Sequence, residues 1–179
     1  MSSLINNYLA ITAIGINNSN LIGKFIQIIS NCGSNILSTK ITALGSEFTC
    51  CLFISGNWGV IAKVEVALSN LEKELGITTI VRRTTPKNNT VGTMPYVAQI
   101  ITMDRLGILQ ELIKFFAKQT IDIEDVTAHT YYAPNNTKMA NIAINITITE
   151  DIHIATLRDK FMTYCDNLNL DASIEPLRY

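Results

Sequence analysis

The chain has 179 residues, of which 47% are hydrophobic and 16% are charged, and its formal net charge is −1. This length suits one domain or two small ones, and the composition is that of a chain that buries a core. No apolar run reaches the roughly 18 residues of a membrane helix, and the first residues do not resemble a signal peptide. We therefore expect a cytoplasmic protein with no membrane contact.

The charge balance argues against direct DNA binding. Fourteen Lys and Arg residues face fifteen Asp and Glu residues. Proteins that bind DNA by themselves usually carry an excess of positive charge that displaces counterions from the phosphates. We expect no such contact from this chain.

The four cysteines show no C-x-x-C spacing, and only two histidines accompany them, so we predict neither a zinc site nor a cofactor. Cys50 and Cys51 are adjacent in a strand-like run and should point to opposite faces. We interpret Cys32, Cys50, Cys51 and Cys165 as reduced core residues.

Hydrophobic periodicity predicts six elements in the first half. In order, they are a strand at 8–14, a helix at 21–29, strands at 36–44 and 48–55, a helix at 60–75 and a strand at 77–83. Gly33 stands just past the end of the first helix, where glycine is favoured. Trp58 opens the second helix, and we expect it to anchor packing.

A polar stretch at 85–94 is the predicted linker between a first domain at 1–84 and a second at 95–179. The second half repeats the pattern. Its strands are expected at 96–103, 123–131, 139–148 and 170–177, with helices at 108–116 and 154–168. Pro176 cannot donate to a sheet ladder, which favours an edge position for the last strand. Asn17 and Asp104, 87 residues apart, occupy matching turns.

A βαββαβ order predicts the α+β class and the ferredoxin-like sandwich. Each unit should be a four-stranded antiparallel sheet with two helices on one face. The first and third strands should be central, and the second and fourth should form the edges. Two small units with exposed edges have reason to associate.

The strongest candidate site is the turn Asp104-Arg105-Leu106-Gly107-Ile108, between a strand end and a helix start. Helix N-terminal amides can receive a carboxylate, Gly107 permits close backbone approach, and Asp104 can hold an ammonium group. The alternative is that Asp104 is a plain helix N-cap, worth roughly 1 kcal/mol. The residue types alone favour the cap.

The matching first-half turn, from Asn17 to Asn20, has side chains able to cap a helix but neither glycine nor acid. We include Asn17 and Asn20 as possible acceptors for a ligand ammonium. No catalytic constellation is evident: His129 stands alone in a strand, and Glu124 and Asp125 project to opposite faces. The chain is therefore predicted not to be an enzyme.

Several runs resemble the glycine cleavage system transcriptional repressor family, whose members carry tandem ACT domains. The most specific are C-G-x-N-I at 32–36 and L-G-x-E-F-T at 44–49, with further likeness at 8–15, 52–58 and 82–85. The likeness covers the whole chain. In the second half it rests on the turn at Asp104, where Leu106 stands in the position of the family's proline.

The resemblance implies a regulator that represses glycine cleavage genes by contacting a DNA-bound, LysR-type activator. Glycine would relieve the repression. ACT domains usually bind amino acids at the turn after the first strand, at a domain interface, which implies a small amino acid as ligand and a possible homodimer.

Two other interpretations remain. Formyltetrahydrofolate deformylase begins with a similar domain but needs a catalytic domain after it. A generic metabolite-binding or assembly module without a transcriptional role is harder to distinguish from a repressor by sequence.

Overall fold

The computed structural model describes residues 6–87 and 92–177, and the chain divides after Lys87 into two compact units. In the first unit the elements are β1 (Asn7–Ile16), α1 (Ser19–Asn31), β2 (Asn35–Leu44), β3 (Glu47–Gly56), α2 (Trp58–Leu75) and β4 (Thr78–Thr84). In the second they are β5 (Met94–Met103), α3 (Ile108–Lys118), β6 (Asp122–Tyr132), β7 (Lys138–Ile148), α4 (Ile154–Asn167) and β8 (Asp171–Pro176). Residues 88–91 of the expected linker lie outside the described residues.

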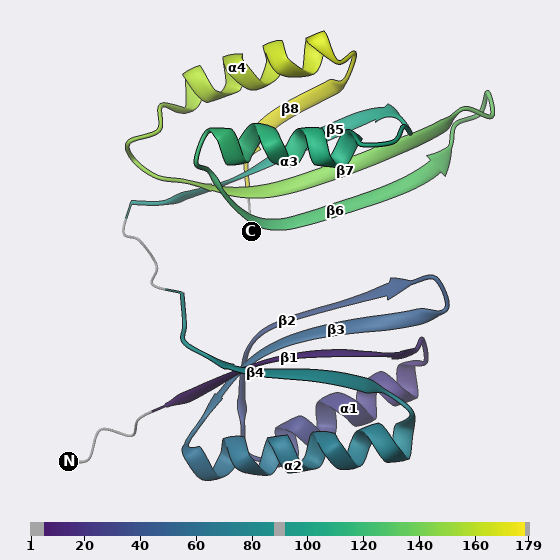
Figure 1. Ribbon diagram of the computed structural model, residues 1–179, viewed down its shortest axis with the longest axis vertical. Helices are drawn as coiled ribbons and strands as arrows, with labels where there is room; N and C mark the ends of the chain where they lie inside the picture. The colour runs from purple at the N-terminus through teal and green to yellow at the C-terminus, as the bar shows by residue number, and fades with distance from the viewer. Residues whose placement is uncertain (1–5, 88–91, 178–179) are drawn as a thin grey trace. The chain divides into compact units, whose positions relative to one another are not determined.

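Each unit is an antiparallel four-stranded sheet with two helices on one face (Figure 1). The strand orders are β2-β3-β1-β4 and β6-β7-β5-β8, so the first and third strands of each unit are central. This confirms the predicted α+β, ferredoxin-like fold. Pro176 lies on the edge strand β8, as its missing N–H requires.

Strict alternation along the central strands builds the core. In β7, Ala140, Ile142, Ile144, Ile146 and Ile148 are buried against the helices. Because successive side chains of a strand point to opposite faces, the intervening polar residues occupy the face that no helix covers.

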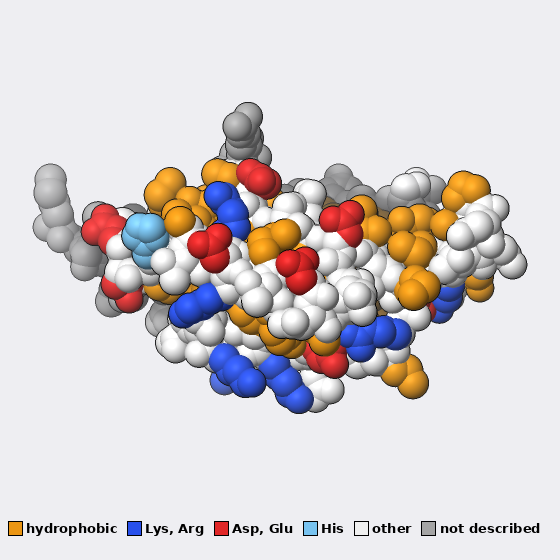
Figure 2. Space-filling model, turned by 90° about the horizontal axis from the view of Figure 1, so that it is seen from above, with side chains coloured by type: hydrophobic (Ala, Val, Ile, Leu, Met, Phe, Trp, Pro, Cys, Tyr) orange, Lys and Arg blue, Asp and Glu red, His pale blue; other side chains and the backbone are white. Residues whose placement is uncertain are grey.

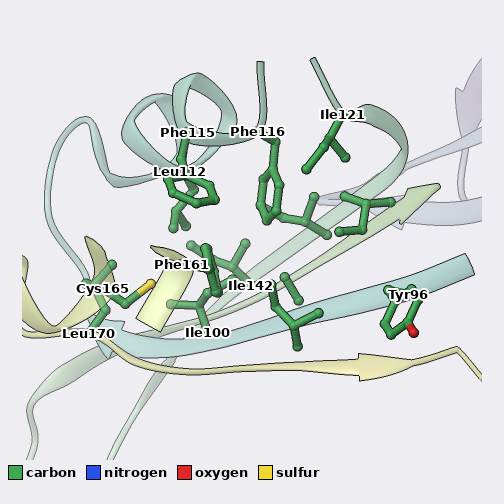
Figure 3. Packing of buried hydrophobic residues seen from close by; sticks show 14 of the residues in the cluster. Tyr96, Ile100, Leu112, Phe115, Phe116, Ile121, Ile142, Phe161, Cys165 and Leu170 are labelled. Atoms are coloured by element: carbon green, nitrogen blue, oxygen red, sulfur yellow. The ribbon is translucent and has the colours of Figure 1, made fainter. Parts of the chain in front are cut away.

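Aromatic side chains fill the space between α3, α4 and the sheet (Figure 3). The rings of Phe115 and Phe161 are 5.2 Å apart between centroids, and those of Phe116 and Phe161 also 5.2 Å. Phe115 further contacts the Tyr164 ring at 5.0 Å. The first unit has a separate core, built around Phe25 and Phe48.

Local signals explain where the helices begin and end. The Asn57 side chain accepts a hydrogen bond from the Val60 N–H at 2.9 Å, which caps α2. Gly76 ends that helix in the left-handed conformation, with φ at +64°. Gly33 lies just past the end of α1, as predicted, and adopts the left-handed conformation with φ at +84°.

Two expectations about side-chain burial were wrong. Trp58 is 66% exposed and does not anchor packing, because the buried stripe of α2 begins at Ile61. Cys50 and Cys165 are core residues, whereas Cys51 is exposed and Cys32 only partly buried. The adjacent pair Cys50 and Cys51 does point to opposite faces, and the face that carries Cys51 has no helix over it.

Burial raises the pKa of the Cys165 thiol from 9.0 to about 11. The unfolded chain then releases this proton at lower pH than the folded chain does. We expect the associated stability to be complete below pH 9.0 and to be lost as the pH rises toward about 11, by at most ~1.4 kcal/mol per pH unit. Urea unfolding of the wild type and Cys165→Ala over this range measures the difference. Parallel pH profiles would contradict the assignment.

Candidate functional site

The turn after β5 leads directly into α3. The Asp104 N–H donates to the Lys138 carbonyl at 2.9 Å, which extends the pairing of β5 with β7 by one residue. Helix α3 then begins at Ile108, with Gly107 as its N-cap residue. The strand end and the helix start are therefore held together by the sheet.

A pocket of about 280 Å³ opens beside this turn. Its wall includes the five residues predicted from this turn, Asp104, Arg105, Leu106, Gly107 and Ile108, but neither Asn17 nor Asn20. The opposite wall comes from β6 and β7, through Ala128, His129, Thr130, Ala140 and Ile142. Sequence reasoning missed these strand residues. The β6–β7 register, which sets Thr130 opposite Ala140, brings them to the turn.

Asp104 does not cap the helix. Its Oδ2 lies 2.6 Å from Nζ of Lys138, and this ion pair raises the pKa of the Lys138 ammonium through a hydrogen bond and charge attraction. The cap interpretation of Asp104 was therefore wrong. Lys138 could have been placed beside Asp104 from sequence, because the third strand of this fold begins where the first one ends.

Gly107 owes its place to backbone conformation. Its φ of +82° and ψ of −5° lie in the left-handed region, which costs other residues roughly 1–2 kcal/mol. A Cβ placed here would meet no heavy atom within 4 Å. The space above Gly107 is thus open, and among the described residues no side chain caps the first-turn amides of α3.

Arg105 and Leu106 differ in how firmly they are held. Arg105 Nη2 donates to Glu111 Oε2 at 2.8 Å, which fixes the guanidinium along the first turn of α3. The Leu106 side chain is fully exposed, whereas Ile108 is buried at 6% exposure. A guanidinium paired with Glu111, amides without a side-chain cap and an apolar residue therefore surround the mouth of the pocket.

The equivalent turn of the first unit is closed by its own side chain. Asn18 caps α1 by accepting a hydrogen bond from the Asn20 N–H at 2.9 Å. The Asn17 N–H donates to the Ser46 carbonyl, also at 2.9 Å. Since Asn18 already accepts a hydrogen bond from a first-turn amide, this turn offers fewer unpaired N–H groups to an anion than the turn at Gly107 does.

Neither an assembled catalytic group nor a metal centre emerges in residues 6–87 and 92–177. No group of three or more His, Cys, Asp or Glu side chains there is arranged to hold a metal ion. In the same ranges, no helix has both the length and the apolar character of a membrane span. Glu124 accepts a hydrogen bond from Thr147, and Asp125 one from Thr127, so these two carboxylates have separate partners.

Comparison with known proteins agrees with this geometry. A family model described as the ACT domain matches residues 7–82, nearly all of the first unit. Over these residues, the first unit is similar to an ACT domain. Because the second unit repeats its element order and sheet order, the predicted tandem ACT fold is confirmed.

Curated relatives match beyond the first ACT domain. The glycine cleavage system transcriptional repressors of Escherichia coli and Shigella flexneri are each 26% identical over 175 residues, which cover 97% of this chain and 92% of each repressor. The resemblance to this family is therefore confirmed. Both relatives are named as regulators and not as enzymes, which agrees with the prediction that the chain is not an enzyme.

Solved structures share the tandem ACT fold. The crystal structure of a putative glycine cleavage system transcriptional repressor superposes with a TM-score of 0.76 at 23% identity, covering 98% of this chain and 99% of that one. An unknown protein from Galdieria sulphuraria reaches 0.75 at 16% identity, over 97% and 99% of the two chains.

Replacing Gly107 by alanine tests whether backbone conformation fixes this position. We expect a loss of roughly 1–2 kcal/mol in the free energy of unfolding, measured by urea denaturation, because alanine must adopt a positive φ. Gly23→Ala is the matched control: Gly23 lies in α1 and its added Cβ also meets no heavy atom within 4 Å. The free energy of unfolding of this control should rise by roughly 0.5–1 kcal/mol, because alanine favours a helix interior more than glycine does. Equal effects of the two substitutions would contradict the assignment.

Proposed function

We propose that the chain is an amino-acid-responsive regulatory protein that represses glycine cleavage genes. The likeness to the named repressors over 97% of the chain carries this proposal. A generic ACT module would share the fold but would not be expected to match these repressors so continuously.

The proposed repressor acts through protein contact with a DNA-bound, LysR-type activator. Its net charge of −1 supports this route, since the counterion release that drives DNA binding needs an excess of positive charge. The activator then supplies the DNA contacts. A homodimer, which the resemblance also suggests, stays a prediction that light scattering can check.

The turn Asp104–Ile108 supports a site for a small amino acid, with glycine first. The uncapped amides at the start of α3 and the positive end of its dipole favour a ligand carboxylate. The Arg105 guanidinium lies on the same side, where it is paired with Glu111. Charge-assisted hydrogen bonds contribute roughly 1.5–3 kcal/mol each, so a small zwitterion needs no large apolar pocket.

The Asp104 carboxylate is the proposed acceptor for the ligand ammonium. Lys138 already pairs with this carboxylate at 2.6 Å. The ligand ammonium and the Lys138 ammonium therefore compete for the same Asp104 oxygens. Both side chains are partly exposed, so water can solvate Lys138 when the ligand displaces it, and the free-energy cost of this displacement is small. Asn17 and Asn20 belong to the first unit, and the proposed site in the second unit does not depend on them.

Calorimetry with glycine tests the site. We expect millimolar-range binding by the wild type, at least about tenfold weaker binding by Asp104→Asn, and tighter binding by Lys138→Met, because this variant frees the carboxylate. Lys24→Met, at an exposed position of α1, is the control and should bind as the wild type does. Absence of heat with any small amino acid, or weaker binding by Lys138→Met, would refute the assignment.

A gel-shift assay with the activator tests the route of repression. The purified chain alone should give no sequence-specific shift of glycine cleavage promoter DNA at physiological salt. Added to the activator–DNA complex, it should change the mobility or occupancy of that complex, and millimolar glycine should reverse the change. If glycine binds but the activator complex is unaffected, the chain is a metabolite-binding module and not this repressor.

A further inference from the structure

We propose that the groove between α3 and α4 binds a short acidic, amphipathic segment of a partner protein. The groove has a volume of about 400 Å³ and is lined by residues of both helices. It is separate from the turn at Gly107 and is not needed for amino-acid binding, so the inference does not rest on the proposed function.

Aromatic packing creates the groove. The Phe115 ring stacks at a tilt against Tyr164 and Phe161, and these large side chains stand between the two helices. The Tyr164 hydroxyl donates to the Glu111 carbonyl at 3.1 Å, which fixes the floor of the groove. Phe115 and Tyr164 therefore offer an apolar floor to an incoming side chain.

Positive charge lines this floor. Lys114 and Lys118 come from α3, Lys160 comes from α4, and all three are exposed. Within the part of the chain that the structure describes, Lys114, Lys118 and Lys160 form no ion pair, and Lys160 donates to the Gln119 side-chain oxygen at 3.5 Å. Glu111, the one acid of the lining, is already paired with Arg105. The groove thus carries unneutralised positive charge on a chain whose net charge is −1.

Figure 2 shows this helix-covered face from above, with Lys and Arg side chains gathered along one side and hydrophobic side chains next to them. Acidic side chains lie across the rest of the face. Asp159 and Asp166 of α4 are exposed but do not line the groove. They would repel a long phosphate backbone that crossed the face, which favours a short, narrow anionic partner.

The size of the groove fits a peptide. From Glu111 to Lys118 the helix axis advances about 10 Å, the length of two helical turns. An amphipathic helix of that length places one apolar residue per turn on the aromatic floor and acidic residues beside the lysines. Burial of the apolar residues supplies affinity, and charge complementarity supplies orientation and selectivity.

Selection from a phage-displayed library of random 12-residue peptides tests the proposal on the full chain. We expect enriched sequences to combine acidic residues with apolar residues at helical spacing. The synthesised peptide should bind at least about tenfold more weakly to the Lys114→Glu, Lys118→Glu double variant, and more weakly at high salt. The control is Lys24→Glu, Lys63→Glu, which reverses two exposed lysines on helices of the first unit. This control should bind as the wild type does.

Three results would overturn the proposal: no enrichment, enriched peptides without acidic residues, or equal binding by the groove variant. Equal competition by inorganic tripolyphosphate or by duplex DNA would also overturn it, because the groove would then recognise anionic charge alone. Circular dichroism of each variant separates loss of binding from loss of fold. None of these outcomes depends on glycine binding or on the activator, so the two proposals fail independently.

Discussion

Burial of one sheet face under two helices is the constraint on which each unit depends. An apolar side chain at every second position of β1, β3, β5 and β7 commits that face to the core. Once it is committed, the register of the central strands is fixed, since a slip of one residue would expose the entire apolar set. The fixed register in turn places the end of β5 beside the start of β7, where Asp104 meets Lys138.

The two units use the same frame differently at two places. The first place is the start of the first helix in each unit. Asn18 caps α1, whereas the left-handed Gly107 leaves the start of α3 without a side-chain cap. At the second place, the rings of Phe115, Phe161 and Tyr164 pack against one another between α3 and α4, whereas the core of the first unit is built around Phe25 and Phe48. Both differences lie on loops and helix faces, which the sheet holds in position but does not constrain in sequence.

Sequence predicted the sheets well because period-two alternation and Gly or Pro at turns are local signals. It named the five residues of the turn at Gly107 but not their partners. Lys138 follows from the antiparallel pairing of the first and third strands, whereas His129 comes from a strand that only the β6–β7 pairing brings to the turn. The groove escaped prediction for the same reason, because Lys114 and Lys160 lie on different helices. The prediction that Trp58 anchors packing was wrong, because helical spacing alone does not show which turn of a helix first contacts the core.

The ion pair between Asp104 and Lys138 has a consequence for the range over which an amino acid could be sensed. A carboxylate already shared with an internal ammonium group binds an external one less tightly than a free carboxylate would. In the proposed function, occupancy would then follow metabolite concentration over the millimolar range and not saturate at trace levels. The same pair gives the Asp104 carboxylate a partner in the empty site, so release of the ligand leaves no unpaired acid behind. Because the pair is partly exposed, its contribution to the threshold of the response would be a modest upward shift.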